Sequence, residues 1–387
     1  MSNLNATSTP GYTFSTGAKT TLASTEREAY LYPHHTPATA QALISTAQSL
    51  VYPRGKGIYA TDETVDGIEA RLIAAQGSGG SAKSWSEEEK REKRRRFREC
   101  LYESLPTDYI SGVILYSETL HDFQLAPVLA QRGIIPGIRA DTDSHPLPLS
   151  PLEPATQGLD DLLPRLVAAH AAGARFTKWR APILCTSVAG GFPSQGALEI
   201  QAESLARFAA VSQQAGLVPI VEPDVDFGED ADLKRSVEIH VKIISLIYAR
   251  CAAYGVLLEG SLIKPSFPQP GLKHPSRATT TAEEIALATA TVLSRSVPIA
   301  VAGVVFLSGG LSDSDSIMYL DALNCLINAS KPPSSLVRLP PLSFSFGRGL
   351  QGDAMRKWVS GDESGAKKAF EERANLCYKA ARGEIKA

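Results

Sequence analysis

The stretch that decides the fold is LEGSLIKP, residues 258–265. It is a short apolar run that ends in Lys264 and is stopped by Pro265. We therefore expect Lys264 where a buried strand meets a loop, and burial there disfavours the charged form of an amine. A lysine so placed is a candidate nucleophile that forms an imine with a carbonyl. The alternative, on this segment alone, is a strand-end lysine whose ammonium group reaches solvent.

Runs of the same kind recur along the chain, each a short apolar segment that ends in polar or charged residues. Together with 259–264 they make eight candidate strands: 57–62 (GIYATD), 112–117 (GVILYS), 135–141 (IPGIRAD), 176–180 (FTKWR), 218–224 (VPIVEPD), 302–308 (AGVVFLS) and 342–348 (LSFSFGR). Amphipathic helical patterns separate several of them, at 159–172, 198–215 and 232–253. Strand–helix alternation indicates a parallel sheet with right-handed crossovers. Eight repeats predict an α/β fold, a closed (β/α)8 TIM barrel.

The domain organisation is indicated by the segments that lie outside the alternating strands and helices. Residues 1–30 are rich in Ser and Thr and lack periodicity, which predicts a disordered N-terminal extension. Residues 31–387 are expected to form one barrel domain, with helices at 37–51 and near 362–382. A charged helix near 77–104 is predicted as an insertion. Its run EEEKREKRRR mixes both signs at i,i+4 spacing, which favours a solvated helix face over a nucleic-acid patch.

Composition excludes several classes of function. The 387 residues carry a formal net charge of −2, which gives no reason to expect nucleic-acid or membrane binding. Apolar runs are too short to span a bilayer. The five cysteines are far apart, which favours reduced thiols and a cytoplasmic protein. The seven histidines form no HxH or HExxH pattern, so no metal or other cofactor is expected.

Polar residues gather where the predicted strands end, and in a barrel of this type the active site lies at those C-terminal ends. The candidates are Asp62, Lys178, Arg180, Glu222, Asp224, Lys264, Ser308, Gly309, Gly310, Ser345, Gly347 and Arg348. Three of them, Lys178, Glu222 and Lys264, come from adjacent strands and would form a row of alternating charge. Replacing such a buried network with apolar residues is often neutral or stabilising, which favours a catalytic role over a structural one.

The row suggests carbonyl chemistry. Desolvation and the like charge of Lys178 would free the amine of Lys264 to attack a carbonyl. Glu222 is placed to shuttle protons, and Asp62, across the barrel mouth, could take a proton from a substrate hydroxyl. The protonated imine would then act as the electron sink for cleavage of a neighbouring C–C bond.

The segments after the last two strands occupy the usual phosphate position of barrels. Ser308, Gly309 and Gly310 offer backbone N–H groups, and Arg348 can clamp phosphate oxygens in bidentate fashion. The glycine pair alone could equally be a tight turn, but the arginine on the adjoining strand favours phosphate. The predicted substrate is therefore a phosphorylated ketose, a small molecule.

From about residue 33 to about 375 the chain resembles the class I, Schiff-base fructose-bisphosphate aldolases. The resemblance is carried by seven motifs in order: GKGIYATDET (55–64), GVILYSETL (112–120), FTKWRAPI (176–183), VPIVEPDV (218–225), LEGSLIKP (258–265), FLSGGLSDSDS (306–316) and FSFGRGLQ (344–351).

The resemblance implies a role for individual residues. Lys264 would be the Schiff-base lysine, and Glu222 the main proton donor and acceptor, helped by Asp62 and Lys178. The phosphate next to the ketone would bind at Ser308, Gly309, Gly310, Ser345 and Arg348, beside Gly347. Arg71 would contact substrate, and Arg180 is expected to do so from its position at a strand end. The resemblance further implies a cytosolic homotetramer that acts in glycolysis and gluconeogenesis.

Four positions depart from the family pattern. Arg139 replaces a lysine, Thr64 and Gly67 replace serines, and Ala70 replaces a basic residue before Arg71. These positions handle the far phosphate in the family. The sequence also ends at Ala387 without the terminal tyrosine of many animal members, which predicts intact cleavage but a slow later proton transfer.

Three functions are compatible with these observations. The first is cleavage of fructose 1,6-bisphosphate to dihydroxyacetone phosphate and glyceraldehyde 3-phosphate. The second is an aldolase with a shifted preference, for example for fructose 1-phosphate, which the four departures motivate. The third is a non-enzymatic scaffold that binds partners through the charged helix at 86–99. The intact set of Lys178, Glu222 and Lys264 argues against the scaffold.

Overall fold

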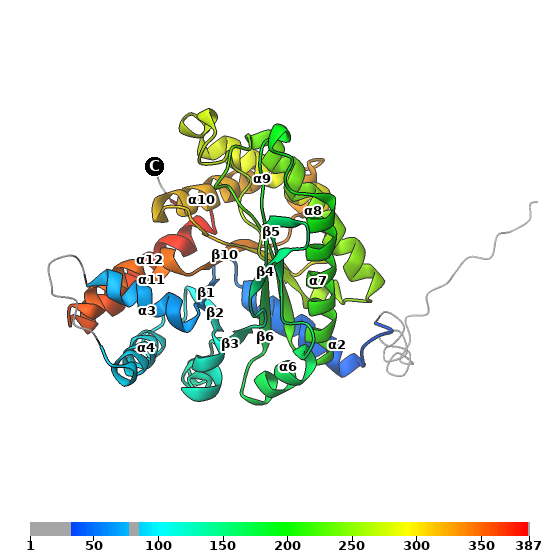
Figure 1. The fold of residues 1–387 in the computed structure, drawn as a ribbon. Coiled ribbons are helices and arrows are strands. Elements are labelled where there is room, and N and C mark those ends of the chain that lie inside the picture. Colours follow the sequence, from blue (N-terminus) through cyan, green and yellow to red (C-terminus); the bar gives the residue numbers. More distant parts are fainter. Residues whose placement is uncertain (1–31, 77–84, 386–387) are drawn as a thin grey trace, which may run out of the picture.

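Eight parallel strands form a closed barrel in the computed structural model, which describes residues 32–76 and 85–385. Their order around the barrel is β1-β10-β9-β8-β7-β6-β3-β2 (Figure 1). The strands are β1 (Gly57–Thr61), β2 (Ile110–Leu115), β3 (Ile135–Arg139), β6 (Phe176–Ile183), β7 (Val218–Val225), β8 (Leu262–Ile263), β9 (Gly303–Phe306) and β10 (Leu342–Phe346). The predicted TIM barrel is confirmed. The extension predicted over 1–30 lies outside the described residues.

Helices surround the strands on all sides (Figure 1). The α-helices are α2 (Pro37–Val51), α3 (Val65–Ala75), α4 (Glu87–Tyr102), α5 (Ala126–Gln131), α6 (Leu162–Ala171), α7 (Gln195–Gln214), α8 (Leu233–Ala253), α9 (Ala282–Ser296), α10 (Asp313–Ala329), α11 (Arg348–Val359) and α12 (Glu363–Ala380). Short turns of other helical types are η1 (Glu118–Asp122), η2 (Val188–Gly190), η3 (Leu258–Gly260), η4 (Pro275–Ala278) and η5 (Ser335–Arg338). None of the helices in the described ranges has both the length and the apolar character needed to cross a bilayer.

The barrel interior changes from apolar to polar along each strand. Side chains on a strand alternate between its two faces, so every second residue points inward. The inward residues near the strand starts form an apolar cluster that includes Ile58, Phe176, Val218, Leu262 and Val305. Two or four residues further along, the same face of β1, β6, β7 and β8 carries Asp62, Lys178, Glu222 and Lys264. Alternation therefore places the chemistry at one end of a packed core.

Helix α2 closes the other end of the barrel. Its buried residues Leu43, Leu50 and Val51 belong to the interior cluster. Glycines make room for them: a Cβ at Gly112 would lie 2.7 Å from a Leu50 methyl, and one at Gly303 would lie 2.6 Å from a Val51 methyl. The prediction of a helix over 37–51 is confirmed, and its packing shows that it closes one end of the barrel.

Two local elements differ from the sequence-based expectations. Residues 258–260 form the turn η3 rather than strand, because the Gln213 amide donates to the carbonyls of Leu257 and Gly260 and holds the chain out of the sheet. An antiparallel hairpin, β4 (Ser144–Leu147) and β5 (Ser150–Thr156), follows β3 and was not predicted. Its prolines and exposed polar residues hide the alternation that reveals most strands.

The charged helix α4 is only half solvated, which corrects the sequence interpretation. Its outer face carries the expected pairs, such as Arg95 with Glu92 and Glu99. Its inner face buries Arg94, which is 5 % exposed, and Arg98, which is 1 % exposed. Arginine is the cation best suited to such buried pairing, because its planar guanidinium binds carboxylates in fixed geometry. Charge pattern alone could not distinguish the two faces.

Candidate active site

A cavity of about 340 Å³ opens at the C-terminal ends of the barrel strands. Its walls are formed by Ala60, Asp62, Glu63, Arg71, Arg139, Asp141, Ser144, Lys178, Arg180, Pro182, Glu222, Asp224, Lys264, Leu307, Ser308, Gly309, Ser345, Gly347 and Arg348. The structure thus brings together the residues predicted from six strand ends, and Arg71 from a helix, with one exception. Gly310 has φ of +79° and lies against the Phe227 ring, so it shapes the turn beside the cavity without lining it.

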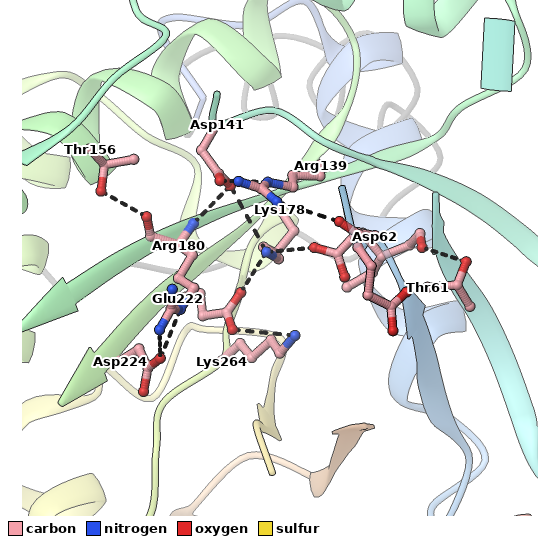
Figure 2. Close-up of polar contacts among 12 residues, drawn as sticks. Thr61, Asp62, Arg139, Asp141, Thr156, Lys178, Arg180, Glu222, Asp224 and Lys264 are labelled. Atoms are coloured by element: carbon pink, nitrogen blue, oxygen red, sulfur yellow. Dashed lines mark hydrogen bonds and ion pairs between the residues drawn. The ribbon is translucent and has the colours of Figure 1, made fainter. Parts of the chain in front are cut away.

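Lys264 projects into this cavity from the end of β8. Its backbone N–H donates to the carbonyl of Val221 at 2.8 Å, which extends the ladder to β7 by one residue. Leu262 points into the barrel core, so Lys264, two residues later, points the same way at the level of the cavity. The side chain is nearly buried, and its Nζ lies 3.4 Å from Glu222 Oε1 (Figure 2).

Glu222 stands between two lysines, as the predicted charge row requires. Lys178 Nζ lies 3.1 Å from Glu222 Oε2, on the opposite side of the carboxylate from Lys264. All three side chains are almost inaccessible to solvent, with Lys178 3 %, Glu222 4 % and Lys264 4 % exposed. One carboxylate can therefore exchange a proton with either amine without a large movement.

Asp62 lies closer to the row than expected. Instead of standing across the mouth, it pairs with Lys178, whose Nζ is 2.7 Å from Asp62 Oδ2 (Figure 2). The order across the floor of the cavity is thus Asp62, Lys178, Glu222 and Lys264. The barrel's closure places β1 near β6 on the inside, although two strands, β2 and β3, separate them along the shorter way around the sheet.

Asp62 and Lys178 are both held in their ionised forms by the charges around them. Burial by itself would raise the pKa of Asp62, but Lys178 and Lys264 outweigh it and hold that pKa well below its ordinary value. Burial would lower the pKa of Lys178, but Asp62 and Glu222 outweigh it and raise that pKa above its ordinary value. Asp62 is therefore a carboxylate, and Lys178 an ammonium, across the neutral range.

Asp141 is a part of the site that the sequence interpretation missed. One oxygen, Oδ2, accepts from Arg139 Nε at 2.7 Å, and Oδ1 accepts from the backbone N–H of Arg180 at 3.1 Å. Lys178 Nζ is 3.9 Å from the same Oδ1. Asp141 fixes the two neighbouring strand ends around Lys178. It closes the predicted run 135–141, so the rule that found Asp62 could have found it.

Arg180 and Asp224 form a further pair on the rim. Arg180 Nε donates to Asp224 Oδ2 at 2.8 Å, and half of the Arg180 side chain is exposed. Burial raises the pKa of Asp224, and Arg180 only partly offsets this. In the strand register Arg180 lies opposite Glu222, and Pro182 lies opposite Asp224. The Arg180 side chain therefore reaches diagonally to Asp224, two residues past Glu222 on β7.

The wall of the cavity that the sequence predicts to bind phosphate is formed by the ends of β9 and β10. The Ser345 hydroxyl is buried there and has no hydrogen-bond partner among the described residues. Arg348 begins α11, so the free N–H groups of that helix face the same region. Gly347 precedes it with its Cα close to β1, where a Cβ would lie 2.8 Å from the Ala60 carbonyl. Ser308 and Gly309 complete this wall.

A second cationic group lies across the cavity. Arg71, on α3, has its Nε 3.8 Å from Glu63 Oε1, and about a third of its side chain is exposed. Glu63 was also missed in the sequence; it directly follows Asp62 and accepts a hydrogen bond from Gln351 at 2.5 Å. Burial raises the pKa of Glu63, and the positive charges of Arg98 and Arg71 partly offset that rise. Arg71 is thus only loosely held and can turn toward an anion.

The family model described as "Glycolytic: Fructose-bisphosphate aldolase class-I" matches residues 42–387. This chain belongs to the class-I fructose-bisphosphate aldolase family. It is 38% identical to the non-muscle fructose-bisphosphate aldolase of Lethenteron camtschaticum over 365 residues, covering 92% of this chain and 94% of the relative. It is 37% identical to fructose-bisphosphate aldolase B of Homo sapiens over the same shares of both chains.

A solved structure of the fructose-bisphosphate aldolase from Plasmodium falciparum, in complex with TRAP and a small-molecule inhibitor, has the same fold. The TM-score is 0.80 at 32% identity, and the alignment covers 90% of this chain and 96% of that one. Sequence and fold therefore agree on membership of the aldolase family over almost the whole chain.

The departures from the aldolase pattern occupy two different places. Arg139 lines the cavity, where Asp141 and the Thr142 carbonyl hold its guanidinium, the latter at 2.8 Å. Thr64 caps α3 and accepts from the Gly67 N–H at 3.2 Å, and neither residue lines the cavity. Ala70 is exposed and also lies outside the cavity wall. A cation is thus kept at the one position of the four that lines the cavity.

Proposed function

We propose that this chain cleaves fructose 1,6-bisphosphate reversibly to dihydroxyacetone phosphate and glyceraldehyde 3-phosphate through an imine on Lys264. The observation that carries the proposal is the pairing of a nearly buried lysine amine with the carboxylate of Glu222 at 3.4 Å, inside a cavity lined by cations. Membership of the aldolase family supports the same reaction.

Imine formation uses the Lys264–Glu222 pair. The amine nitrogen of Lys264 adds to the ketone carbon of the substrate and gives a carbinolamine. Glu222 takes the proton that the Lys264 ammonium loses before attack and gives it to the carbinolamine hydroxyl, which leaves as water, and the product is a protonated imine. Lys178, fixed as an ammonium beside Glu222, offsets the negative charge of that carboxylate once the proton has been delivered.

Carbon–carbon cleavage needs a base for the hydroxyl two carbons from the imine. Asp62, held ionised by Lys178, is the acceptor that we propose for this proton. The electron pair of the breaking C–C bond moves into the protonated imine, which releases the aldehyde and leaves an enamine. Protonation of that enamine carbon and addition of water to the imine release dihydroxyacetone phosphate and restore Lys264.

We propose that the two phosphates bind on opposite walls. The phosphate next to the ketone would accept from the Ser345 hydroxyl, from backbone N–H groups near Gly309 and from Arg348. The unpartnered Ser345 hydroxyl and the start of α11 support this placement. The far phosphate would bind Arg71 and Arg139, and Arg180 lies on the rim between the two walls.

Reductive trapping tests the mechanism. The protein is incubated with dihydroxyacetone phosphate and borohydride, digested, and mapped by mass spectrometry, and the adduct is expected on Lys264. Lys264→Arg should abolish both trapping and turnover, because a guanidinium cannot form the imine. Lys273→Arg, on the exposed segment after β8, is the matched control and should change neither. An adduct on Lys178, or normal turnover by Lys264→Arg, would refute the proposal.

The position of Arg139 motivates one comparison of substrates. Its guanidinium is already engaged by Asp141, so it can offer the far phosphate fewer free N–H groups than an unpaired cation could. Measuring kcat/KM for fructose 1,6-bisphosphate and fructose 1-phosphate tests this. We still expect the bisphosphate to be preferred, because Arg71 and Arg139 both line the wall proposed for its far phosphate. A higher value for the monophosphate would favour the alternative substrate.

The cellular setting is proposed on the same footing. We propose a cytosolic homotetramer that works in glycolysis and gluconeogenesis. The name of the matching family supports the pathway. The five cysteines, all unpaired in the structure, support a reducing compartment. Light scattering coupled to size-exclusion chromatography measures the assembly, and a monomeric mass at micromolar concentration would contradict the tetramer.

A further inference from the structure

The chain leaves the sheet directly after the proposed imine lysine. Strand β8 has two residues, and its register with β7 pairs Ile220 with Leu262 and Val221 with Ile263. The last ladder bond is the one from Lys264 N–H to the Val221 carbonyl. Backbone pairing to β7 thus reaches Lys264 itself, and the geometry beyond that point depends on side chains.

A serine side chain joins the two strands beyond the ladder. Ser266 Oγ accepts from the backbone N–H of Val225 at 3.0 Å and lies 3.1 Å from the Val225 carbonyl. Ser266 comes two residues after Lys264, and Val225 comes three residues after Glu222. This one hydroxyl therefore spans the segments that carry the two groups of the proposed reaction.

A buried histidine holds that hydroxyl from the other side. His240, on α8, is 1 % exposed; its Nδ1 lies 2.7 Å from the Ser236 carbonyl and its Nε2 lies 3.0 Å from Ser266 Oγ. A carbonyl only accepts, so Nδ1 carries the hydrogen. Burial lowers the pKa of His240 to about 4, which leaves the ring neutral and Nε2 free to accept from the Ser266 hydroxyl.

We propose that His240 is a positioning residue for the reaction: through Ser266 it fixes the ends of β7 and β8, and hence the separation of Glu222 and Lys264. This inference rests on the proposed role of Lys264. His240 does not line the cavity, so it acts without contact to substrate. The Ser236 hydroxyl strengthens the anchor, because it accepts from the Gln269 N–H at 3.1 Å and ties the following loop to α8.

A small displacement at this point has a large effect on rate. Reacting groups must meet at near-contact distance, and a misplacement of about 1 Å can cost ~100-fold in rate. Loss of the His240 anchor should therefore lower kcat for cleavage and the rate of imine formation. It should leave KM nearly unchanged, because the phosphate ligands lie on other strands.

Two substitutions of His240 separate positioning from simple destabilisation. In His240→Gln the longer amide reaches the place of Nε2 and can still accept from Ser266. In His240→Asn the amide reaches only the place of Nδ1, so the bond to Ser236 survives and the bond to Ser266 is lost. We expect His240→Asn to reduce kcat and the borohydride trapping rate by about tenfold or more, and His240→Gln to restore most of both.

The partner residue supplies an independent measurement. Ser266→Ala should reproduce the loss in kcat, and the double variant His240→Asn/Ser266→Ala should be no slower than the slower single variant. Thr289→Val is the control for a lost buried hydrogen bond, because Thr289 Oγ1 donates to the Ile285 carbonyl at 2.6 Å on α9, which packs against α8. It should lower Tm and leave kcat unchanged.

The outcomes distinguish this inference from the proposed function. If the wild-type protein does not trap an adduct on Lys264, the proposed function fails, whatever His240 does. If the wild-type adduct forms on Lys264 but His240→Asn traps and turns over as fast as wild type, only the positioning role is overturned. The positioning role would also be overturned if His240→Asn and His240→Gln lost kcat equally, in proportion to their losses of Tm.

Discussion

At the scale of single residues, the site is a line of four ionisable groups in which Asp62 and Lys178 hold each other ionised. Asp62 and Lys178 pair at 2.7 Å, and Glu222 lies between Lys178 and Lys264. Removing one member therefore changes the others. Substitutions that keep volume but remove charge, such as Asp to Asn, give the clearest separation of chemical steps.

Asp62→Asn should separate imine formation from C–C cleavage. The proposed base for the substrate hydroxyl is lost, so kcat for the bisphosphate should fall by roughly 10²–10⁴-fold. Trapping of dihydroxyacetone phosphate should continue, because Lys264 and Glu222 remain. Asp66→Asn, an exposed position in the first turn of α3, is the control and should behave as wild type. Loss of trapping together with cleavage would contradict the division of roles.

The same pair predicts how stability depends on pH. The folded-state pKa of Asp62 is depressed, so its stabilising contribution is present above the ordinary value of 3.8 and is lost as pH falls toward the folded value. The folded-state pKa of Lys178 is raised, so its contribution is present below 10.5 and is lost as pH rises toward the folded value.

Urea unfolding from pH 3 upward measures the acid side of this dependence. The difference in free energy of unfolding between wild type and Asp62→Asn should be constant near neutrality and should shrink as the solution becomes acidic. A difference that stays the same down to the acid limit would show that the Asp62 charge contributes nothing.

At the scale of elements, α4 links the surface to the site. Arg94 donates to both oxygens of Glu118, at 3.0 and 2.6 Å, and also pairs with Glu69. Arg98, the next inward arginine, donates to the Glu63 carbonyl at 3.4 Å, directly beside Asp62. A helix that looks fully solvated in sequence thus braces the segment after β1.

Arg94→Ala should therefore be costly. It leaves the carboxylates of Glu69 and Glu118 buried without their main partner, a loss of about 3 kcal/mol in the free energy of unfolding. Arg96→Ala is the matched control on the same helix; its side chain is mainly exposed and pairs with Glu92 alone, so little loss is expected. Chemical denaturation measures both. If the two substitutions lowered the free energy of unfolding equally, α4 would behave as a helix whose charged residues are all solvated.

The elements differ in how well they could be predicted from the sequence. The eight strands and the residues at their ends were predictable because parallel strands share one edge and alternation fixes direction. Asp141 obeys the same rule and was overlooked. The inner arginines of α4 and the hydrogen bonds of Ser266 to Val225 and His240 were not predictable. Each depends on which distant segment packs against a helix face.

At the scale of the whole molecule, stability and chemistry occupy opposite ends of the barrel. The apolar cluster around α2 fills one end, and the charged cavity opens at the other. The fold class and the family were evident from sequence, since motif order survives without coordinates. The role of α2 as a plug was not, since an amphipathic helix before the first strand could pack on any face.

Leu50→Ala tests that separation. Leu50 is fully buried above Gly112, and its truncation should cost about 2–5 kcal/mol through the cavity left behind. The kcat of the folded fraction should not change, because the strand ends that carry the site are far from α2. Thermal unfolding and turnover at 25 °C, measured on the same preparation, decide the point. A parallel fall in kcat would show that the two ends are coupled.

The closure of the barrel by α2 also governs the order in which molecules enter and leave. With one end filled, ketose, aldehyde and water all use the same mouth. Under the proposed mechanism, the aldehyde must leave through that mouth before water can reach the imine carbon that it had covered. Hydrolysis of the bound half is thereby delayed until the first product has gone, and in the reverse direction the same passage lets an aldehyde arrive while the three-carbon partner is still attached.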